Sequence, residues 1–350
     1  MYSFKNDYSE GAHPAILNKL IETNMVQEEG YGYDSHTVEA IALIRSQMNN
    51  QEADVHFLSG GTQTNLTAIS AFLRPFEAVI SPATGHIFVN EAGAIEATGH
   101  KVVTVKGEQG KLNPELIEPV LKQLHDDHTV KPKLIYISNP TEIGTIYTKA
   151  ELTCLSRYCK ENGLYLYVDG ARLGSALIAK DNDLTLSELA SMVDSFYIGG
   201  TKNGTMFGEA LVICNPSLQS DFRMNMKQKG AMLAKSRFMG IQFGELFRNR
   251  LYYDLAEHAN RMAGLLQKGI LEEGYTFLTH SSTNQVFPIF PNSVIEQLQE
   301  DFLFYVWEKI DDGHSAIRLI TSWATQEEQV DAFIKVLQNI GERTQHQLTI

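Results

Sequence analysis

The chain has 350 residues, enough for about two domains, and its 43% hydrophobic and 20% charged residues are typical of a globular protein. Its 42 acidic and 29 basic residues give a net charge of −13, which disfavours binding to nucleic acid or to anionic membranes. Three cysteines without a Cys-x-x-Cys pair favour a reducing cytoplasm, and the sequence predicts neither a membrane span of ~18 apolar residues nor a signal peptide.

Up to about residue 215, short apolar runs alternate with amphipathic stretches. Apolar residues at helical spacing predict helices over 36–49, 66–72, 114–125 and 149–162. Short apolar runs predict strands over 55–58, 78–80, 101–105, 134–137, 165–168, 195–198 and 210–213. This alternation indicates βαβ units with right-handed crossovers and therefore a mainly parallel sheet.

After residue 215 the pattern changes. The segment 216–273 is predicted to be mostly helical. Beyond it, strands are predicted over 275–278, 284–289, 302–307 and 316–320, and helices over 293–300 and 325–341. This order predicts a smaller α+β domain after a long linking helix. No repeat or Pro-rich linker separates the two parts, so we expect them to pack closely.

Two polar residues directly follow predicted strands. Asp169 directly follows the strand at 165–168, and α/β sheets bind ligands at this end of their strands. A carboxylate in this place can also cap a following helix. Lys202 follows the strand at 195–198 and stands next to glycines. Such a lysine can form a Schiff base once its ammonium loses a proton, although a solvated turn lysine has the same neighbours. For each residue alone, both interpretations stay open.

A segment rich in glycine and threonine, 60–65, follows the strand at 55–58 and opens a helix. Free N–H groups at a helix N-terminus suit a phosphate, and a tight turn with a threonine cap is the alternative. The segment matches neither the ATP nor the NAD fingerprint. His86 is isolated, as structural histidines commonly are, while His125 and His128 lie in a charged stretch without zinc-like spacing. We therefore predict no bound metal.

The joint pattern says more than its parts. A phosphate segment, Asp169 and Lys202 occur in that order on one α/β domain, which points to pyridoxal 5′-phosphate as the common ligand. This cofactor needs an amine for its aldehyde, an anion near its pyridine nitrogen and a cradle for its phosphate. Asp169 would keep the nitrogen protonated, because a nearby anion raises the pyridinium pKa.

The sequence resembles the low-specificity L-threonine aldolases, which are pyridoxal-phosphate enzymes related to the β-eliminating lyases. The resemblance covers nearly the whole chain. It rests on Asn-Asp at 6–7, Gly-Tyr-Gly-Tyr-Asp at 30–34, Gly-Thr-Gln-Thr-Asn at 61–65, Gly-His at 85–86, Pro-Thr-Glu-Ile-Gly-Thr at 140–145, Val-Asp-Gly-Ala-Arg at 168–172, Thr-Lys-Asn-Gly at 201–204 and Ile-Arg-Leu-Ile-Thr at 317–321.

This resemblance implies an aspartate-aminotransferase-like α/β fold (fold type I). A large domain over 15–240 would contain a mainly parallel seven-stranded sheet, and residues 1–14 and 241–350 would form a smaller α+β domain. The implied enzyme is a lyase that cleaves L-threonine, L-allo-threonine and other β-hydroxy-α-amino acids to glycine and an aldehyde. It also implies a cytoplasmic homo-oligomer, a tetramer built as a dimer of dimers, and the helical region 216–273 offers surface for its interfaces.

The resemblance also assigns roles to residues. Lys202 would be the Schiff-base lysine, Asp169 the pyridinium partner and His86 the residue stacked on the cofactor ring, while His128 would be a catalytic histidine contributed by a neighbouring subunit. His86, or a water assisted by His128, would take the β-hydroxyl proton. The remaining residues implied to bind the cofactor are Gly61, Thr62 and Thr201, and those implied to bind the substrate are Asn6, Arg172 and Arg318.

Three positions depart from the pattern of the family. Asn6 replaces a serine, residues 138–142 read Ser-Asn-Pro-Thr-Glu where many members have Glu-Asn-Thr-His-Asn, and Asn203 replaces a glycine. The first two leave the preferred amino acid open. Two alternatives to the aldolase also stay open: β-elimination or racemisation with the same cofactor, and a protein that binds the cofactor without catalysis.

Overall fold

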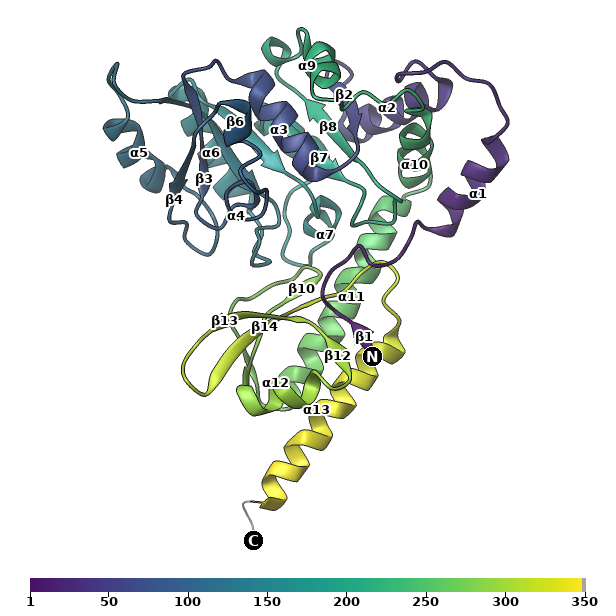
Figure 1. Ribbon diagram of the computed structural model, residues 1–350, viewed down its shortest axis with the longest axis vertical. Coiled ribbons are helices and arrows are strands. Elements are labelled where there is room, and N and C mark those ends of the chain that lie inside the picture. The colour runs from purple at the N-terminus through teal and green to yellow at the C-terminus, as the bar shows by residue number, and fades with distance from the viewer. Residues whose placement is uncertain (348–350) are drawn as a thin grey trace.

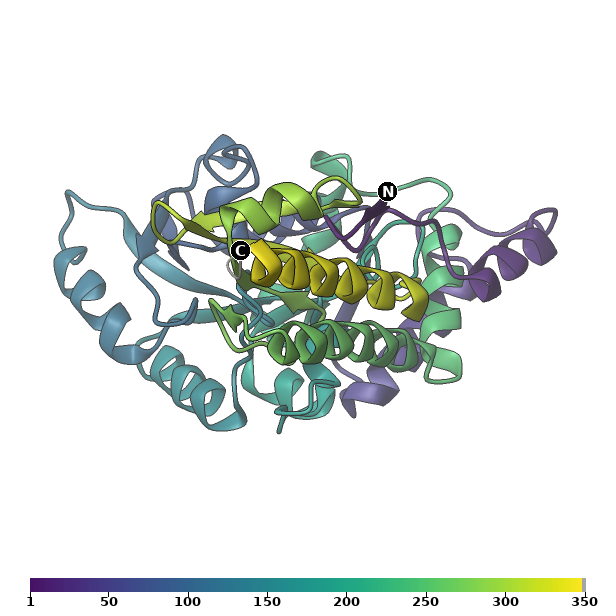
Figure 2. The ribbon, with the colours of Figure 1, turned by 90° about the horizontal axis from the view of Figure 1, so that it is seen from below.

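The computed structural model describes residues 1–347. A large α/β part and a smaller α+β part are joined by the long helix α11 (Leu251–Glu272), as Figure 1 shows. Seen from below, α11 and α13 (Glu327–Gln347) lie side by side across the smaller part (Figure 2). Within residues 1–347, no helix is both long enough and apolar enough to cross a membrane.

The large part is built on one seven-stranded sheet in the order β2-β8-β7-β6-β5-β3-β4. Among the described strands of this sheet, β8 alone is reversed relative to the other six, so the predicted mainly parallel sheet is confirmed. The strands are β2 (Asp54–Leu58), β3 (Glu77–Pro82), β4 (Val102–Val105), β5 (Lys131–Ser138), β6 (Tyr165–Asp169), β7 (Ser195–Gly199) and β8 (Glu209–Ile213).

Both faces of this sheet are buried because its apolar side chains alternate between two layers of helices. Ile135 and Ile137 of β5 belong to one core cluster, while Leu134 and Tyr136 belong to the other. The first cluster includes residues of α2 (Ser35–Met48), α5 (Pro114–Gln123), α6 (Lys149–Glu161), α8 (Leu186–Met192) and α10 (Arg237–Arg248). The second includes residues of α3 (Gly61–Phe72), α4 (His86–Val89) and α9 (Phe222–Gln228).

Short elements complete the large part. These are α1 (Pro14–Thr23), which Figure 1 shows at the edge of the molecule, α7 (Leu173–Leu177) and two 3-10 turns, η1 (Glu96–Thr98) and η2 (Pro216–Leu218). The segment predicted to be mostly helical, 216–273, contains η2, α9, α10 and α11. The domain limits at 15–240 stay a prediction.

The smaller part has an antiparallel sheet against which α11, α12 (Asn292–Leu298) and α13 pack. Its strands are β9 (Thr276–Phe277), β10 (Gln285–Val286), β11 (Pro288–Pro291), β13 (Tyr305–Lys309) and β14 (His314–Ile320). The single strand predicted over 302–307 is wrong. Residues 302–303 form β12, which pairs with β1 (Tyr2–Ser3), whereas β13 pairs with β14. The sequence pattern carries no sign of a pairing between segments about 300 residues apart.

Two glycines bring the ends of β6 and β7 together. A Cβ on Gly170 would lie 1.9 Å from the carbonyl oxygen of Tyr197, and one on Gly199 would lie 2.2 Å from that of Ala171. No other residue fits at such distances. The close approach positions Asp169 and the loop that begins at Gly200 at the same edge of the sheet.

Candidate active site

The cavity at this edge of the sheet has a volume of about 340 Å³. It lies at the carboxyl ends of β5, β6 and β7, next to the start of α3, where open α/β sheets bind ligands. Seven of the ten predicted site residues line it: Gly61, Thr62, His86, Asp169, Arg172, Thr201 and Lys202.

Asp169 is a buried carboxylate with four hydrogen-bond donors. The hydroxyls of Tyr136 and Tyr197 each donate at 2.6 Å, the Asn65 amide donates at 3.1 Å and the Ala171 N–H donates at 3.0 Å. Burial alone would raise the pKa of Asp169, but the charge of His86 and the two tyrosine hydroxyls outweigh it and lower that pKa. The site therefore holds a stable anion beneath the cavity.

His86 is tied to the same network through Glu91. Its Nδ1 lies 2.8 Å from Glu91 Oε1, which also accepts from Asn65 at 2.7 Å. Burial alone would lower the pKa of His86, but the Glu91 hydrogen bond and the Asp169 charge raise it. Ligand atoms of His86, Glu91 and Asp169 lie within 4.8 Å of one another, a spacing that suits a metal. The Asp169 oxygens already accept hydrogen bonds from surrounding donors and so are not free to bind a metal. We therefore keep the prediction that this site binds no metal.

Lys202 lies in the loop after β7, and its side chain reaches the cavity. Burial lowers the pKa of Lys202, the charge of Arg172 lowers it further, and the nearby carboxylates oppose both effects. A lowered pKa favours the neutral amine that nucleophilic chemistry needs. Asn203, one of the departures from the family pattern, donates to the Tyr252 carbonyl at 2.7 Å and so fixes this loop on α11.

The first turn of α3 also forms part of the cavity wall. This helix begins at Gly61 with no side-chain cap, so its first N–H groups have no intrahelical partner. The strand pairing sets Glu209 opposite Leu58, immediately before this turn. Glu209 accepts from the Gly200 N–H at 3.0 Å, and burial raises the pKa of Glu209 to about 8.

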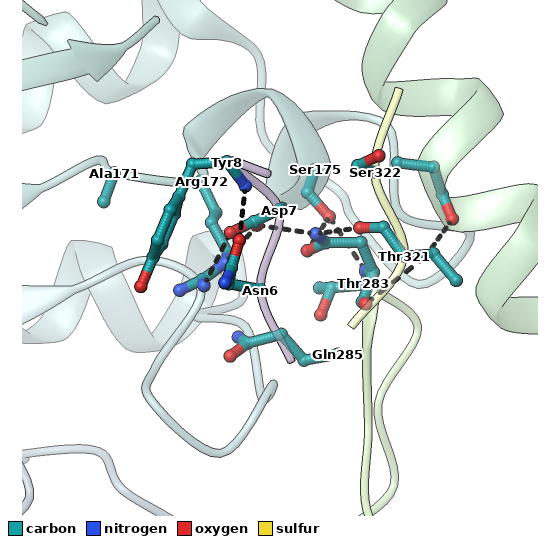
Figure 3. A network of polar contacts seen from close by, with 12 residues as sticks. Asn6, Asp7, Tyr8, Ala171, Arg172, Ser175, Thr283, Gln285, Thr321 and Ser322 are labelled. Atoms are coloured by element: carbon teal, nitrogen blue, oxygen red, sulfur yellow. Dashed lines mark hydrogen bonds and ion pairs between the residues drawn. The ribbon is translucent and has the colours of Figure 1, made fainter. Parts of the chain in front are cut away.

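Arg172 forms a buried ion pair that the sequence did not predict. Its Nε and Nη2 donate to Asp7 at 2.6 and 3.0 Å, and Asn284 donates to the same carboxylate at 2.9 Å. Figure 3 shows Asp7 on the N-terminal segment, facing Arg172. The neighbouring Asn6 instead accepts from the Tyr8 N–H at 3.0 Å, and its predicted substrate role stays a prediction.

Arg318 and His128 are not among the described residues that line the cavity. Arg318, on β14, has its guanidinium 4.6 Å from the ring of Trp307, and its buried Nε has no hydrogen-bond partner. Burial and the charge of Arg172 lower the pKa of Arg318 to about 10, so it is still a cation at neutral pH. His128 is exposed in the loop before β5, and its role in a neighbouring subunit stays a prediction.

Sequence reasoning missed several polar residues around the cavity. They are Asp7, Asn65, Glu91, Tyr136, Glu142, Tyr197 and Glu209. The tyrosines gave a usable signal, because a buried tyrosine within an apolar strand needs a partner for its hydroxyl. The carboxylates gave none, since acidic residues are mostly solvated.

Comparison with known proteins assigns the chain to a family. The sequence model of the beta-eliminating lyase family matches residues 6–292. The chain belongs to the beta-eliminating lyase family. It is 32% identical over 331 residues to the low specificity L-threonine aldolase of Pseudomonas aeruginosa, covering 93% of this chain and 94% of that protein. The predicted resemblance to these enzymes is confirmed, and the family consists of pyridoxal-phosphate-dependent lyases.

Solved structures agree with this placement. The Leishmania major threonine aldolase superposes with a TM-score of 0.96 at 50% identity, covering 97% of this chain and 100% of that one. The aspartate aminotransferase of Thermus thermophilus superposes with a TM-score of 0.71 at 14% identity, covering 97% and 91%. At that identity the likeness shows the fold alone, and it confirms the predicted aspartate-aminotransferase-like architecture.

The buried Glu209 predicts a pH dependence of stability. Because its pKa is raised to about 8 from an unfolded value of about 4.3, the native state binds more protons than the unfolded state between these values. The free energy of unfolding should therefore fall as pH rises through this window and level off above pH 8. Glu209→Gln cannot lose stability in this way, because glutamine does not titrate. The difference in melting temperature between the variant and wild type should therefore be at least ~1 °C larger at pH 8 than at pH 5, in favour of the variant, as expected for a loss of about 1 kcal/mol in the wild type.

Calorimetry at pH 5, 7 and 8 without added cofactor measures this difference. Glu300→Gln, a change at an exposed site, serves as the control and should follow wild type at every pH. Melting curves of Glu209→Gln that run parallel to wild type across the whole range would contradict the raised pKa.

Proposed function

We propose that this protein is a pyridoxal-phosphate-dependent L-threonine aldolase that cleaves β-hydroxy-α-amino acids to glycine and an aldehyde. One observation carries the proposal. A lysine with a lowered pKa, a carboxylate stabilised as an anion and an uncapped helix N-terminus line one cavity of a chain from this lyase family. The names of its relatives, low specificity L-threonine aldolase and threonine aldolase, support the same activity.

The residues of the cavity fit pyridoxal phosphate. Its volume, about 340 Å³, falls within the range of small-molecule sites. The N–H groups at the start of α3 would bind the phosphate, together with the hydroxyls of Thr62 and Thr201. A Cβ on Gly61 would lie 3.1 Å from the Tyr197 hydroxyl, so glycine keeps this turn close to the Asp169 network.

Each side chain has a distinct task in this proposal. Asp169 would pair with the pyridine nitrogen, His86 would cover the ring and Lys202 would hold the cofactor through its aldehyde. Once bound, the cofactor supplies an electron sink for the bond that breaks at the substrate Cα. Arg318 and Arg172 bind the substrate carboxylate, since a guanidinium recognises it in a bidentate manner. Arg318 has the unused donor, and Asp7 orients Arg172.

The activity test uses stereoisomers of threonine. L-Threonine and L-allo-threonine should both give acetaldehyde and glycine, with kcat/KM values within about a thousandfold, or ~4 kcal/mol, of each other. D-Threonine should not react, because the two arginines and the amine linkage together fix the configuration at Cα. A coupled assay for acetaldehyde measures all three. Formation of pyruvate and ammonia from serine without any aldehyde from threonine would point to β-elimination instead.

Lys202 should be the residue that binds the cofactor covalently. Borohydride reduction of the loaded protein followed by peptide mapping should place the label on Lys202. Lys202→Ala should lose the label and reduce turnover by several orders of magnitude. Lys149→Ala, which removes an exposed lysine paired with Glu188, should keep both. A label on any other lysine would end this assignment.

We propose that the enzyme is a homo-oligomer, in keeping with the expected tetramer. Large apolar side chains are exposed on and after α1: Ile21 is 74% exposed, Met25 is 88% exposed and Tyr33 is 60% exposed. Exposed apolar side chains of this size are typical of an interaction surface, and further copies of this chain would cover them.

Sedimentation at micromolar concentration should therefore give a mass above that of one chain. The double variant Ile21→Glu/Met25→Glu should shift the protein toward smaller species, because a buried charge opposes association. A fully active monomeric wild-type protein would refute the proposal.

The cysteines support a reducing location, which we propose to be the cytoplasm. Cys154, Cys159 and Cys214 are all free thiols. Burial raises the pKa of Cys159 and of Cys214 to about 12, so both stay protonated and unreactive.

A further inference from the structure

The aldolase reaction needs a group that takes the proton of the β-hydroxyl. This group must reach the cavity and must not already be assigned to the cofactor. Asp169 is bonded to two tyrosines and two further donors, and Lys202 is assigned to the cofactor aldehyde. Of the other imidazole and carboxyl groups on the wall, Glu209 accepts from the Gly200 N–H at the start of the Lys202 loop, which leaves His86 and Glu142.

His86 is poorly suited to accept a proton. Its Nδ1 is bonded to Glu91 at 2.8 Å, and the charges of Glu91 and Asp169 raise its pKa despite burial. A raised pKa makes the imidazole protonated over a wider pH range, and a protonated imidazole cannot accept a proton. Its ring is also the group that would cover the cofactor.

Glu142 is held in place from two sides. Its Oε1 accepts from the Ser138 hydroxyl at 2.7 Å and from the backbone N–H of His86 at 3.0 Å. Ser138 ends β5 and His86 begins α4, so the carboxyl is fixed between two rigid elements. Its other oxygen, Oε2, is buried and has no hydrogen-bond partner. A buried acceptor without a partner is uncommon and retains capacity for one donor.

We infer that Glu142 takes the β-hydroxyl proton of the substrate when the Cα–Cβ bond breaks. The inference rests on the proposed aldolase function. A new O–H bond forms on the Glu142 carboxylate, and the electron pair of the old O–H bond becomes the second bond of the aldehyde carbonyl. The pair of the Cα–Cβ bond would be taken up by the electron sink that bound pyridoxal phosphate supplies, and Cα then gains a proton from solvent to give glycine. After the aldehyde has left, Glu142 releases its proton to solvent.

The surroundings of Glu142 adjust its basicity for this task. Burial raises its pKa, the Ser138 hydrogen bond lowers it and the charge of Asp169 raises it again, with a net rise. A general base is more effective when its pKa lies closer to the working pH. The charged or titratable groups that face it are His86 from α4, Asp169 from β6, Tyr136 from β5, Arg172 from the start of α7 and Tyr147 from the loop before α6.

The test separates the β-hydroxyl step from the rest of the reaction. Glu142→Gln keeps an oxygen for the Ser138 and His86 donors but cannot accept a proton. In the loaded enzyme, kcat for L-threonine cleavage should fall about 10²–10⁴-fold, the usual contribution of a general base, while KM changes little. Exchange of the glycine α-proton in D₂O, followed by NMR, involves no β-hydroxyl and should stay within about threefold of wild type.

Two further variants control for structural effects. Glu142→Asp keeps the acid and should recover part of the lost cleavage. Ser138→Ala removes one anchor of the carboxyl but not the base, so its loss should be smaller than that of Glu142→Gln. In wild type, kcat/KM should decline at low pH as Glu142 is protonated, and this decline should be absent from the residual activity of Glu142→Gln.

The outcomes are distinguishable. Glu142→Gln with cleavage within about tenfold of wild type overturns the inference and leaves the proposed function intact. Equal losses of cleavage and glycine exchange in Glu142→Gln also overturn it, because they indicate a structural role. Wild-type enzyme that exchanges glycine but releases no aldehyde from threonine overturns the proposed function, and the inference with it.

Discussion

The site depends on keeping one carboxylate ionised away from water. An unpaired buried charge is costly, so the sheet must supply donors for Asp169. It does so with tyrosines whose side chains share one face: Tyr136 on β5 and Tyr197 on β7 flank β6, which carries Asp169. Asn65 of α3 then connects Asp169 to Glu91 and so to His86. The anion thereby fixes α3, α4 and three strands relative to one another.

A second buried charge joins the two parts of the molecule. Asp7 belongs to the N-terminal segment, and Figure 3 shows it facing Arg172 of the loop after β6. Asn284 of the smaller part donates to the same Asp7 carboxylate, so all three residues form one network. Breaking such a pair leaves an uncompensated charge, which typically costs about 3–5 kcal/mol. The network therefore couples the position of Arg172 to the position of the smaller part relative to the large part. The smaller part also carries Arg318.

The sequence predicted what depends on periodicity and on motifs, and missed what depends on distant contacts. The alternation of apolar residues located the seven strands, and Asp169 and Lys202 were found because they follow strands. The strand predicted over 302–307 failed because β12 pairs with the first residues of the chain. Asp7 was noted only as part of a motif, since nothing local indicates that Arg172 is its partner.

Three acids in or beside one cavity illustrate how environment, rather than residue type, sets protonation. All are enclosed by protein, so burial pushes each pKa upward. Asp169 receives four donors and the His86 charge, and its pKa falls nonetheless. Glu142 accepts from Ser138 and the His86 N–H, Glu209 accepts from the Gly200 N–H and Thr201, and the pKa values of both acids rise. The number of donors around each carboxyl thus divides the acids between a permanent anion and groups that can exchange a proton. The proposed reaction needs both kinds of acid in one cavity: a permanent anion for the chemistry at Cα and a group that exchanges a proton with the β-hydroxyl.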